Sequence, residues 1–122
     1  MSRFLAIDHV QLAIPEGKES RARSFYGEVL GLTEVAKPAE MAERPAIWFA
    51  SGPVNLHIRS DPEFHPAKKA HPALLVEGLD AILSRCRAAG VATRQDTSFN
   101  GLRRFHVFDP FGNRLELMER EG

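Results

Sequence analysis

The chain has 122 residues, the length of a single domain that can bury its own hydrophobic core. Its 16 basic and 16 acidic residues cancel and form no long run of like charge. This balance argues against a nucleic acid or an anionic membrane as the partner and favours a small molecule. No apolar run reaches the roughly 20 residues of a membrane helix and no signal peptide is recognisable, so we expect a cytoplasmic protein.

The first half of the chain predicts a strand, a helix and three further strands. Apolar and polar residues alternate over residues 7–14, as in a strand with one buried face. Residues 18–30 carry apolar side chains three and four positions apart, which predicts an amphipathic helix that ends at Gly31. The three further strands are expected at residues 32–36, 46–50 and 54–59.

The second half repeats this order. A strand is expected at 71–77, and a helix follows with Leu79 and Cys86 on its apolar stripe and Gly90 as its cap. Three more strands are expected at residues 91–94, 103–108 and 114–119. Gly31 and Gly90 are 59 residues apart, as are His57 and Glu116. We interpret Cys86 as a core residue because it lies on this apolar stripe, and as the only cysteine it has no partner for a disulfide.

The repeat predicts an α+β fold of two tandem βαβββ modules within a single domain. Module one covers about residues 1–60, a linker about 60–70, and module two about 71–122. Neither half alone has enough apolar surface to form a stable core. With the helices on one face, we expect a curved mixed sheet whose other face surrounds an open, concave cleft.

Four potential metal ligands are distributed over the strand segments. His9, His57 and Glu116 each lie opposite the apolar residues of their segment, and His71 opens a segment with a weaker alternation. Imidazole nitrogens and carboxylate oxygens are good ligands for divalent transition metals. The cleft is therefore predicted to bind a metal ion.

The same alternation places further side chains in the cleft, and each has two interpretations. Arg59 and Arg104 bind a substrate carboxylate or phosphate, or are solvated. His106 is an acid and base, or a hydrogen-bonded wall of the pocket. Trp48 and Phe108 are either a platform for the substrate or part of the core. Glu116 is a ligand or base, or it forms an ion pair with Arg114 or Arg104.

Three motifs carry a resemblance to a known family: the opening Asp8-His9-Val10, the helix end at residues 25–32, and the closing Asp-Pro-Phe-Gly-Asn-Arg-Leu-Glu at residues 109–116. Through these motifs the chain resembles the vicinal oxygen chelate superfamily, and the resemblance covers essentially its whole length. Its members include glyoxalase I, fosfomycin-resistance thiol transferases, methylmalonyl-CoA epimerase, extradiol dioxygenases and the metal-free bleomycin-binding proteins.

The resemblance implies a divalent metal (Zn, Ni, Mn, Fe or Co) bound by His9, His71 and Glu116. His57 is the fourth ligand if the chain follows the four-ligand members of the family, and it is not a ligand if the chain follows the three-ligand members. It also implies a homodimer, in which His9 and His57 of one chain face His71 and Glu116 of the other. Glyoxalase I-like proteins have a glutamate at the position of His57, so this chain departs from them there. Residues 37–44 are also too short for a glutathione-binding insertion, and no loop suggests the monovalent cation site of fosfomycin-type enzymes.

These features imply a glyoxalase-like, divalent-metal-dependent enzyme that acts on a small oxygen-chelating substrate. A lyase, an isomerase or a transferase fits this description, with Glu116 and His106 as the catalytic residues. Two alternatives stay open. One is an extradiol-dioxygenase-like enzyme, and the other is a bleomycin-resistance-like protein that sequesters a small molecule and catalyses nothing.

Overall fold

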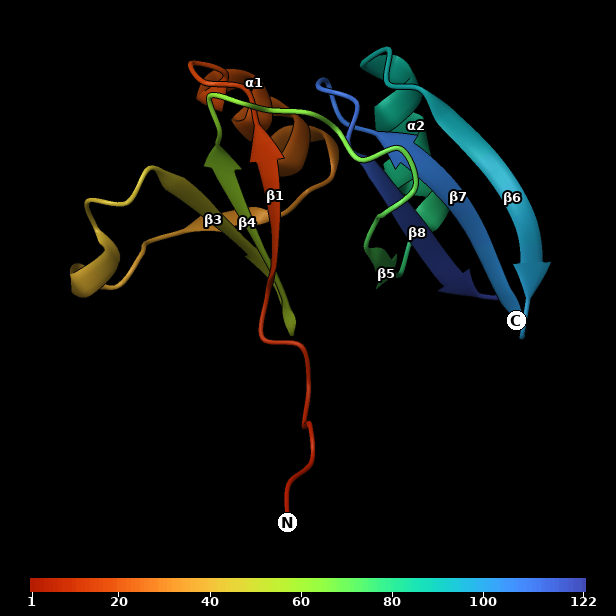
Figure 1. The fold of residues 1–122 in the computed structure, drawn as a ribbon. Coiled ribbons are helices and arrows are strands. Elements are labelled where there is room, and N and C mark those ends of the chain that lie inside the picture. Colours follow the sequence, from red (N-terminus) through yellow and green to blue (C-terminus); the bar gives the residue numbers. More distant parts are fainter.

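The computed structural model describes residues 1–122 and has an α+β architecture of two tandem modules (Figure 1). The first module contains β1 (Val10–Ile14), α1 (Glu19–Ala22), η1 (Arg23–Val29), β2 (Thr33–Val35), η2 (Ala39–Met41), β3 (Ala46–Ser51) and β4 (Val54–Ser60). The second contains β5 (Ala73–Leu75), α2 (Leu79–Ala88), β6 (Thr93–Phe99), β7 (Leu102–Phe108) and β8 (Arg114–Arg120). None of the helices combines the length and hydrophobicity that crossing a membrane requires.

Each module forms its own four-stranded mixed sheet. The strand orders are β1-β4-β3-β2 and β5-β8-β7-β6. In both sheets the first strand pairs in parallel with the last strand of its module, and the other pairs are antiparallel. The matching order agrees with the duplication that the sequence predicts. The expected curved surface is thus built from two separate sheets, which splay apart in Figure 1.

One hydrophobic core joins the two modules. It contains apolar residues from both helical segments and both sheets, including Phe25, Phe49, Leu83, Cys86 and Leu117. The helices therefore pack on the inner faces of the sheets, and the opposite faces stay open for polar side chains. Cys86 is completely buried, as the apolar stripe predicts.

A buried polar corner also connects the modules. The Asp109 carboxylate accepts hydrogen bonds from the Tyr26 hydroxyl, at 2.7 Å, and from Asn113 Nδ2, at 2.8 Å. Asn113 Nδ2 also donates to the carbonyl of Ala13 in β1, at 2.8 Å. Gly112, with φ +95°, allows the tight turn between Asp109 and Asn113. The turn before β8 is thereby anchored to the helix and first strand of the other module.

Several element boundaries differ from the prediction. The ladders of the two first strands begin at Val10 and Ala73, so His9 and His71 lie just before their strands. The helix expected at 18–30 is a short α-helix followed by a seven-residue π-helix. Apolar spacing over so few turns does not distinguish these two pitches, since a side chain four positions further on lies near the same face in both. Strand β6 extends to Phe99, well beyond residue 94, where the predicted strand ends. The prediction ended too early because the polar sequence after residue 94 has no alternation of apolar and polar residues.

Candidate functional site

A compact cluster of potential ligands lies on the open face of module two. His71, His106 and Glu116 offer ligand atoms that all lie within 4.8 Å of one another. The parallel pairing of β5 with β8 places Ala73 opposite Glu116, which brings the preceding His71 close: its Nε2 is 2.8 Å from Glu116 Oε1. His106 lies directly opposite Glu116 on β7.

Glu116 is held as a carboxylate in this cluster. Its residue is 5% exposed, and burial alone would raise its pKa. Hydrogen bonds from His71 and Arg104 and the charge of Arg104 outweigh burial, so the pKa of Glu116 is lowered from its usual value. Arg104 Nη1 donates to Oε2 at 3.2 Å, whereas Arg114 donates to the carbonyl of Lys68. Of the two ion pairs considered for Glu116, the structure therefore contains the one with Arg104.

His106 is oriented by a residue that the sequence did not single out. Its Nε2 lies 2.8 Å from Asp96 Oδ2, and Arg104 Nη1 lies 3.3 Å from the same oxygen. The hydrogen bond with His106 is the main cause that lowers the pKa of Asp96, followed by the backbone N–H of Thr97. The ionised carboxylate fixes the proton of His106 on Nε2, and Nδ1 is buried without a hydrogen-bond partner.

Asp96 was missed because the strand expected at 91–94 continues through it. Its register places it opposite Arg104, on the same face as His106. Extending the predicted strand by two residues would have revealed it.

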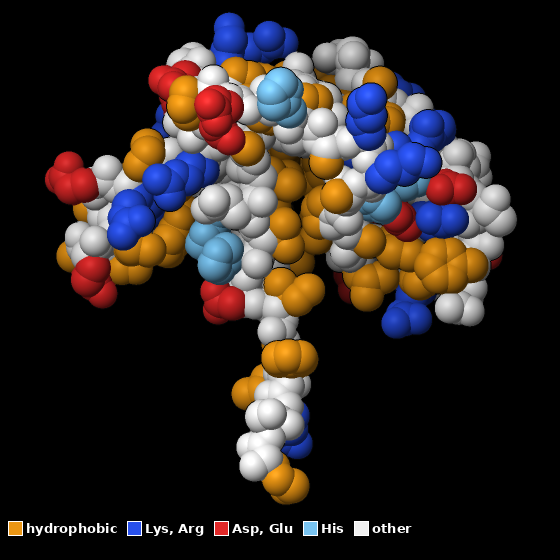
Figure 2. Space-filling view, viewed as in Figure 1, with side chains coloured by type: hydrophobic (Ala, Val, Ile, Leu, Met, Phe, Trp, Pro, Cys, Tyr) orange, Lys and Arg blue, Asp and Glu red, His pale blue; other side chains and the backbone are white.

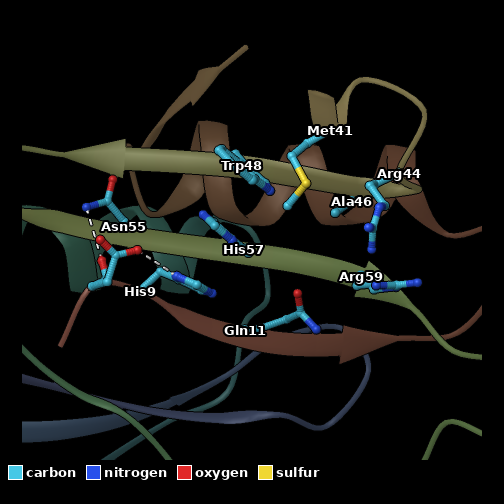
Figure 3. A pocket seen from close by; sticks show the side chains of 10 residues that line it. His9, Gln11, Met41, Arg44, Ala46, Trp48, Asn55, His57 and Arg59 are labelled. Atoms are coloured by element: carbon cyan, nitrogen blue, oxygen red, sulfur yellow. Dashed lines mark hydrogen bonds and ion pairs between the residues drawn. The ribbon is translucent and has the colours of Figure 1, made fainter. Parts of the chain in front are cut away.

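The face of module one carries a stack of three aromatic rings (Figure 3). The ring of His57 lies 4.1 Å from that of Trp48 and 4.1 Å from that of His9, with nearly parallel planes. Asp8 Oδ2 is 2.8 Å from His9 Nδ1. Burial, and next the charge of His9, lower the pKa of His57, which keeps this imidazole neutral and able to act as a ligand.

This stack borders a cavity of about 410 Å³. His9 and Asn55 lie at one end of it in Figure 3, and Arg44 and Arg59 lie at the other. Arg44 belongs to the segment between η2 and β3, for which the sequence predicted no strand or helix. No alternation pattern could therefore have indicated its direction.

The single chain brings the predicted metal ligands together only in pairs. His9 stacks on His57 in module one, and His71 contacts Glu116 in module two. His9 and His71 line a common hollow of about 360 Å³ between the starts of β1 and β5, but neither His9 nor His57 joins the cluster around Glu116.

The predicted substrate-binding residues divide in the same way. Trp48 and Arg59 line the cavity of module one, and Arg104 belongs to the cluster of module two. Phe108 lies on β7 two residues beyond His106, on the same face of the strand. The guanidinium groups of Arg94 and Arg114 lie 5.8 and 5.9 Å from the centre of its ring.

Comparisons with known proteins match the chain over nearly its whole length. The family model described as Glyoxalase/Bleomycin resistance protein/Dioxygenase superfamily matches residues 6–117. A solved structure of a Bacillus anthracis protein assigned to the glyoxalase family is 41% identical, with 99% of each chain covered and a TM-score of 0.90. No curated protein matches the sequence.

Two more distant structures share the fold. A glyoxalase/dioxygenase from Nostoc punctiforme is 20% identical, with 100% of this chain and 99% of that chain covered and a TM-score of 0.78. The fosfomycin resistance protein FosX from Listeria monocytogenes is 15% identical, with coverage of 96% and 94% and a TM-score of 0.72.

Proposed function

The chain belongs to the glyoxalase/bleomycin resistance protein/dioxygenase superfamily, and from this premise we propose that it is a glyoxalase-like, divalent-metal-dependent enzyme. It acts in the cytoplasm on a small substrate that offers oxygen atoms to the metal, as a lyase, an isomerase or a transferase. The observation that carries this proposal is the buried, ionised Glu116 carboxylate facing His71 Nε2 at 2.8 Å.

The chemistry of the donor set fits a divalent transition metal. His71 and Glu116 provide one imidazole and one carboxylate on a partly buried face, and His9 and the neutral His57 provide two further imidazoles. When bound, such a metal would act as a Lewis acid on the substrate oxygens and lower the barrier to loss of a proton or a leaving group.

We propose that two chains share each site as a homodimer. The two ligand pairs lie apart in the single chain, so each needs donors from elsewhere to form a four-ligand site. The segment before β1 supports a partner chain, because Phe4, Leu5 and Ile7 are almost fully exposed along an arm that leaves the body of the protein (Figure 2). A continuous run of exposed apolar side chains is unfavourable in water and marks a contact surface. Twofold symmetry then produces two equivalent sites.

His106 is proposed to move the proton of the reaction. Asp96 accepts a hydrogen bond from Nε2, which leaves the lone pair on Nδ1 as the proton acceptor. His106 is 3% exposed, so bulk water does not compete for this nitrogen. Trp48 and Arg59 contact the substrate from module one, and Arg104 and Phe108 from module two.

Metal analysis tests the proposal. Protein purified without added metal is compared with the variants Glu116→Gln and His9→Ala, and His65→Ala serves as the control because His65 is an exposed histidine of the linker. We expect close to one metal ion per chain in the parent and in His65→Ala, and a loss in the two site variants. Equal trace amounts in all four proteins would refute the metal site.

A substrate screen then separates the kinds of reaction. The hemithioacetal of methylglyoxal and glutathione, fosfomycin with a thiol, and catechols represent the three enzyme classes considered. Turnover of catechols with oxygen uptake would favour the dioxygenase alternative. Binding of a test compound without turnover, by protein that lacks metal, would favour the sequestering alternative.

A further inference from the structure

The cavity of module one has a strongly cationic end. Arg44 and Arg59 line it at the end away from His9 (Figure 3). Lys37 lies beside this end, where its Nζ donates to the carbonyl of Ala46, a residue of the cavity wall, at 2.6 Å. The only carboxylate that lines the cavity is that of Asp8, which is paired with His9 at the opposite end.

Neither of the two guanidinium groups has a partner in the protein. Arg104 and Arg103 form ion pairs with nearby carboxylates, but Arg44 and Arg59 form no ion pair and no side-chain hydrogen bond. Glu16 and Glu19 border a neighbouring hollow together with Arg44, yet neither comes within 4.0 Å of its guanidinium group. The donors of both arginines are therefore free to bind a ligand.

The sheet leaves room for a ligand group beside Arg59. In the register of module one, Arg59 is opposite Ala13 on β1 and Ala46 on β3, so small side chains flank it on both sides. Arg59 lies two residues beyond His57 on the same face of β4, which corresponds to roughly 7 Å along the strand. A small molecule of a few bonds spans this distance.

We propose that Arg44 and Arg59 bind an oxyanion of the substrate, a carboxylate or a phosphonate, while the flat surface of Trp48 and His57 supports the rest of the molecule. The inference rests on the proposed function, because it places the oxygen-chelating end of the substrate near His57. Guanidinium groups match the geometry of carboxylates and phosphonates through paired hydrogen bonds. The substrate class is thus a small organic anion whose chelating oxygens lie roughly 7 Å from its charged group.

Trp48 gives a direct readout, because it is the only tryptophan of the chain and lies in the cavity. Its fluorescence is titrated with methylphosphonate and with acetate, and with dimethyl methylphosphonate and acetamide as uncharged counterparts. We expect a saturable change with at least one anion and none with the uncharged compounds. Which anion binds more tightly distinguishes phosphonate from carboxylate substrates.

Three variants localise the effect. Replacing both arginines, Arg44→Gln with Arg59→Gln, should raise Kd at least about tenfold, since a hydrogen bond to a charged group contributes more than 1.4 kcal/mol. The single variant Arg59→Lys keeps Arg44 and a positive charge at position 59, so it should raise Kd less than the double replacement does. Arg87→Gln is the matched control, an exposed arginine on α2 outside the cavity, and should leave Kd unchanged.

The same titration on the Glu116→Gln variant separates this inference from the metal proposal. A response shared by the parent and Glu116→Gln, and lost in the double arginine variant, supports the anion site whether or not the protein contains metal. No saturable response in the parent would overturn the inference. A response that disappears in Glu116→Gln and persists in the double arginine variant would also overturn it, because the anion would then bind at the metal ligands.

Discussion

Nε2 of His71 lies 2.8 Å from Oε1 of Glu116, although the two residues are 45 positions apart in the sequence. The parallel pairing of β5 with β8 creates this contact, because it brings the start of one strand to the middle of the other. His106 approaches the same carboxylate from the antiparallel neighbour β7. Each residue of the cluster can therefore be replaced separately, without changing the strand pairing that positions the others.

Replacing His106 separates proton transfer from metal binding. The variant His106→Gln should lower kcat by a factor of roughly 100 to 10,000, the usual contribution of a positioned acid or base, while the metal content stays at the parental level. Steady-state kinetics on the substrate found by the screen, beside elemental analysis, measure both quantities. If the metal is lost together with activity, His106 is a ligand and the assignment as proton carrier is wrong.

Asp96 should affect activity through His106. The variant Asp96→Asn keeps the shape of the side chain but removes the charge that fixes the proton on Nε2. We expect a smaller decrease of kcat than in His106→Gln, with little change in KM, and no further decrease when both substitutions are combined. Additive effects of the two variants would show that Asp96 acts independently of His106.

Mixing two inactive variants tests whether chains share a site. In a dimer of His9→Ala with Glu116→Gln, one site carries both substitutions and the other carries neither. Random exchange of chains should therefore restore metal and activity to about one quarter of the sites. The control is Glu116→Gln mixed with His71→Ala, which damages the same module and restores nothing. Failure of the first mixture to recover, despite proven chain exchange, would place each site within one chain.

The N-terminal arm should stabilise the dimer. The variant Phe4→Asp removes one of its exposed apolar side chains, whose burial is worth about 2 kcal/mol, so Kd of the dimer should rise by more than about tenfold. Sedimentation velocity over a range of concentrations measures this shift. Ser2→Asp introduces the same charge on the same arm and keeps every apolar residue, and it should leave the dimer intact. Equal behaviour of both variants would exclude the arm as a contact.

Tyr26 should couple stability to alkaline pH. Burial, and next the charge of Asp109, raise the pKa of Tyr26 well above its usual value of 10.0. The folded protein then holds this proton more tightly than the unfolded chain, so the stabilising contribution is complete below about pH 10 and is lost as the pH rises toward the folded pKa.

The variant Tyr26→Phe should therefore unfold with a weaker dependence on pH above 10 and be less stable at neutral pH, by about 1 to 3 kcal/mol. Because Tyr26 is the only tyrosine, the absorbance of tyrosinate reports its titration directly. A normal tyrosine pKa in the folded protein would contradict this expectation.

The sequence was sufficient for the repeated architecture and for the faces of the central strands. His57, Glu116 and Trp48 could be placed because clear alternation surrounds them. The duplication was revealed by one offset, since Gly31 and Gly90 are as far apart in the sequence as His57 and Glu116. Alternation describes one strand at a time and contains no information on how two modules are arranged. For this reason the four expected ligands could be named from the strands, whereas their division into two pairs followed only from the family resemblance.

The two residues that the sequence missed have different physical reasons. Asp96 lies on the edge strand β6, where both faces are largely polar and no burial pattern marks the strand. Arg44 lies outside the strands, so its position depends on the path of the chain between η2 and β3. Contacts of this kind follow from tertiary structure and leave no local pattern.

Equivalent places in the two modules carry side chains of different chemistry. The offset of 59 residues makes His57 equivalent to Glu116 and Arg59 equivalent to Met118. His57 and Arg59 lie on β4, the last strand of module one, and Glu116 and Met118 lie on β8, the last strand of module two. One module thus presents a neutral ring followed by a positive charge, and the other a negative charge followed by an apolar chain. In the proposed dimer, where these faces of two chains meet, a ligand contacts different groups on its two sides, so it has one preferred orientation even though the folds around it are alike.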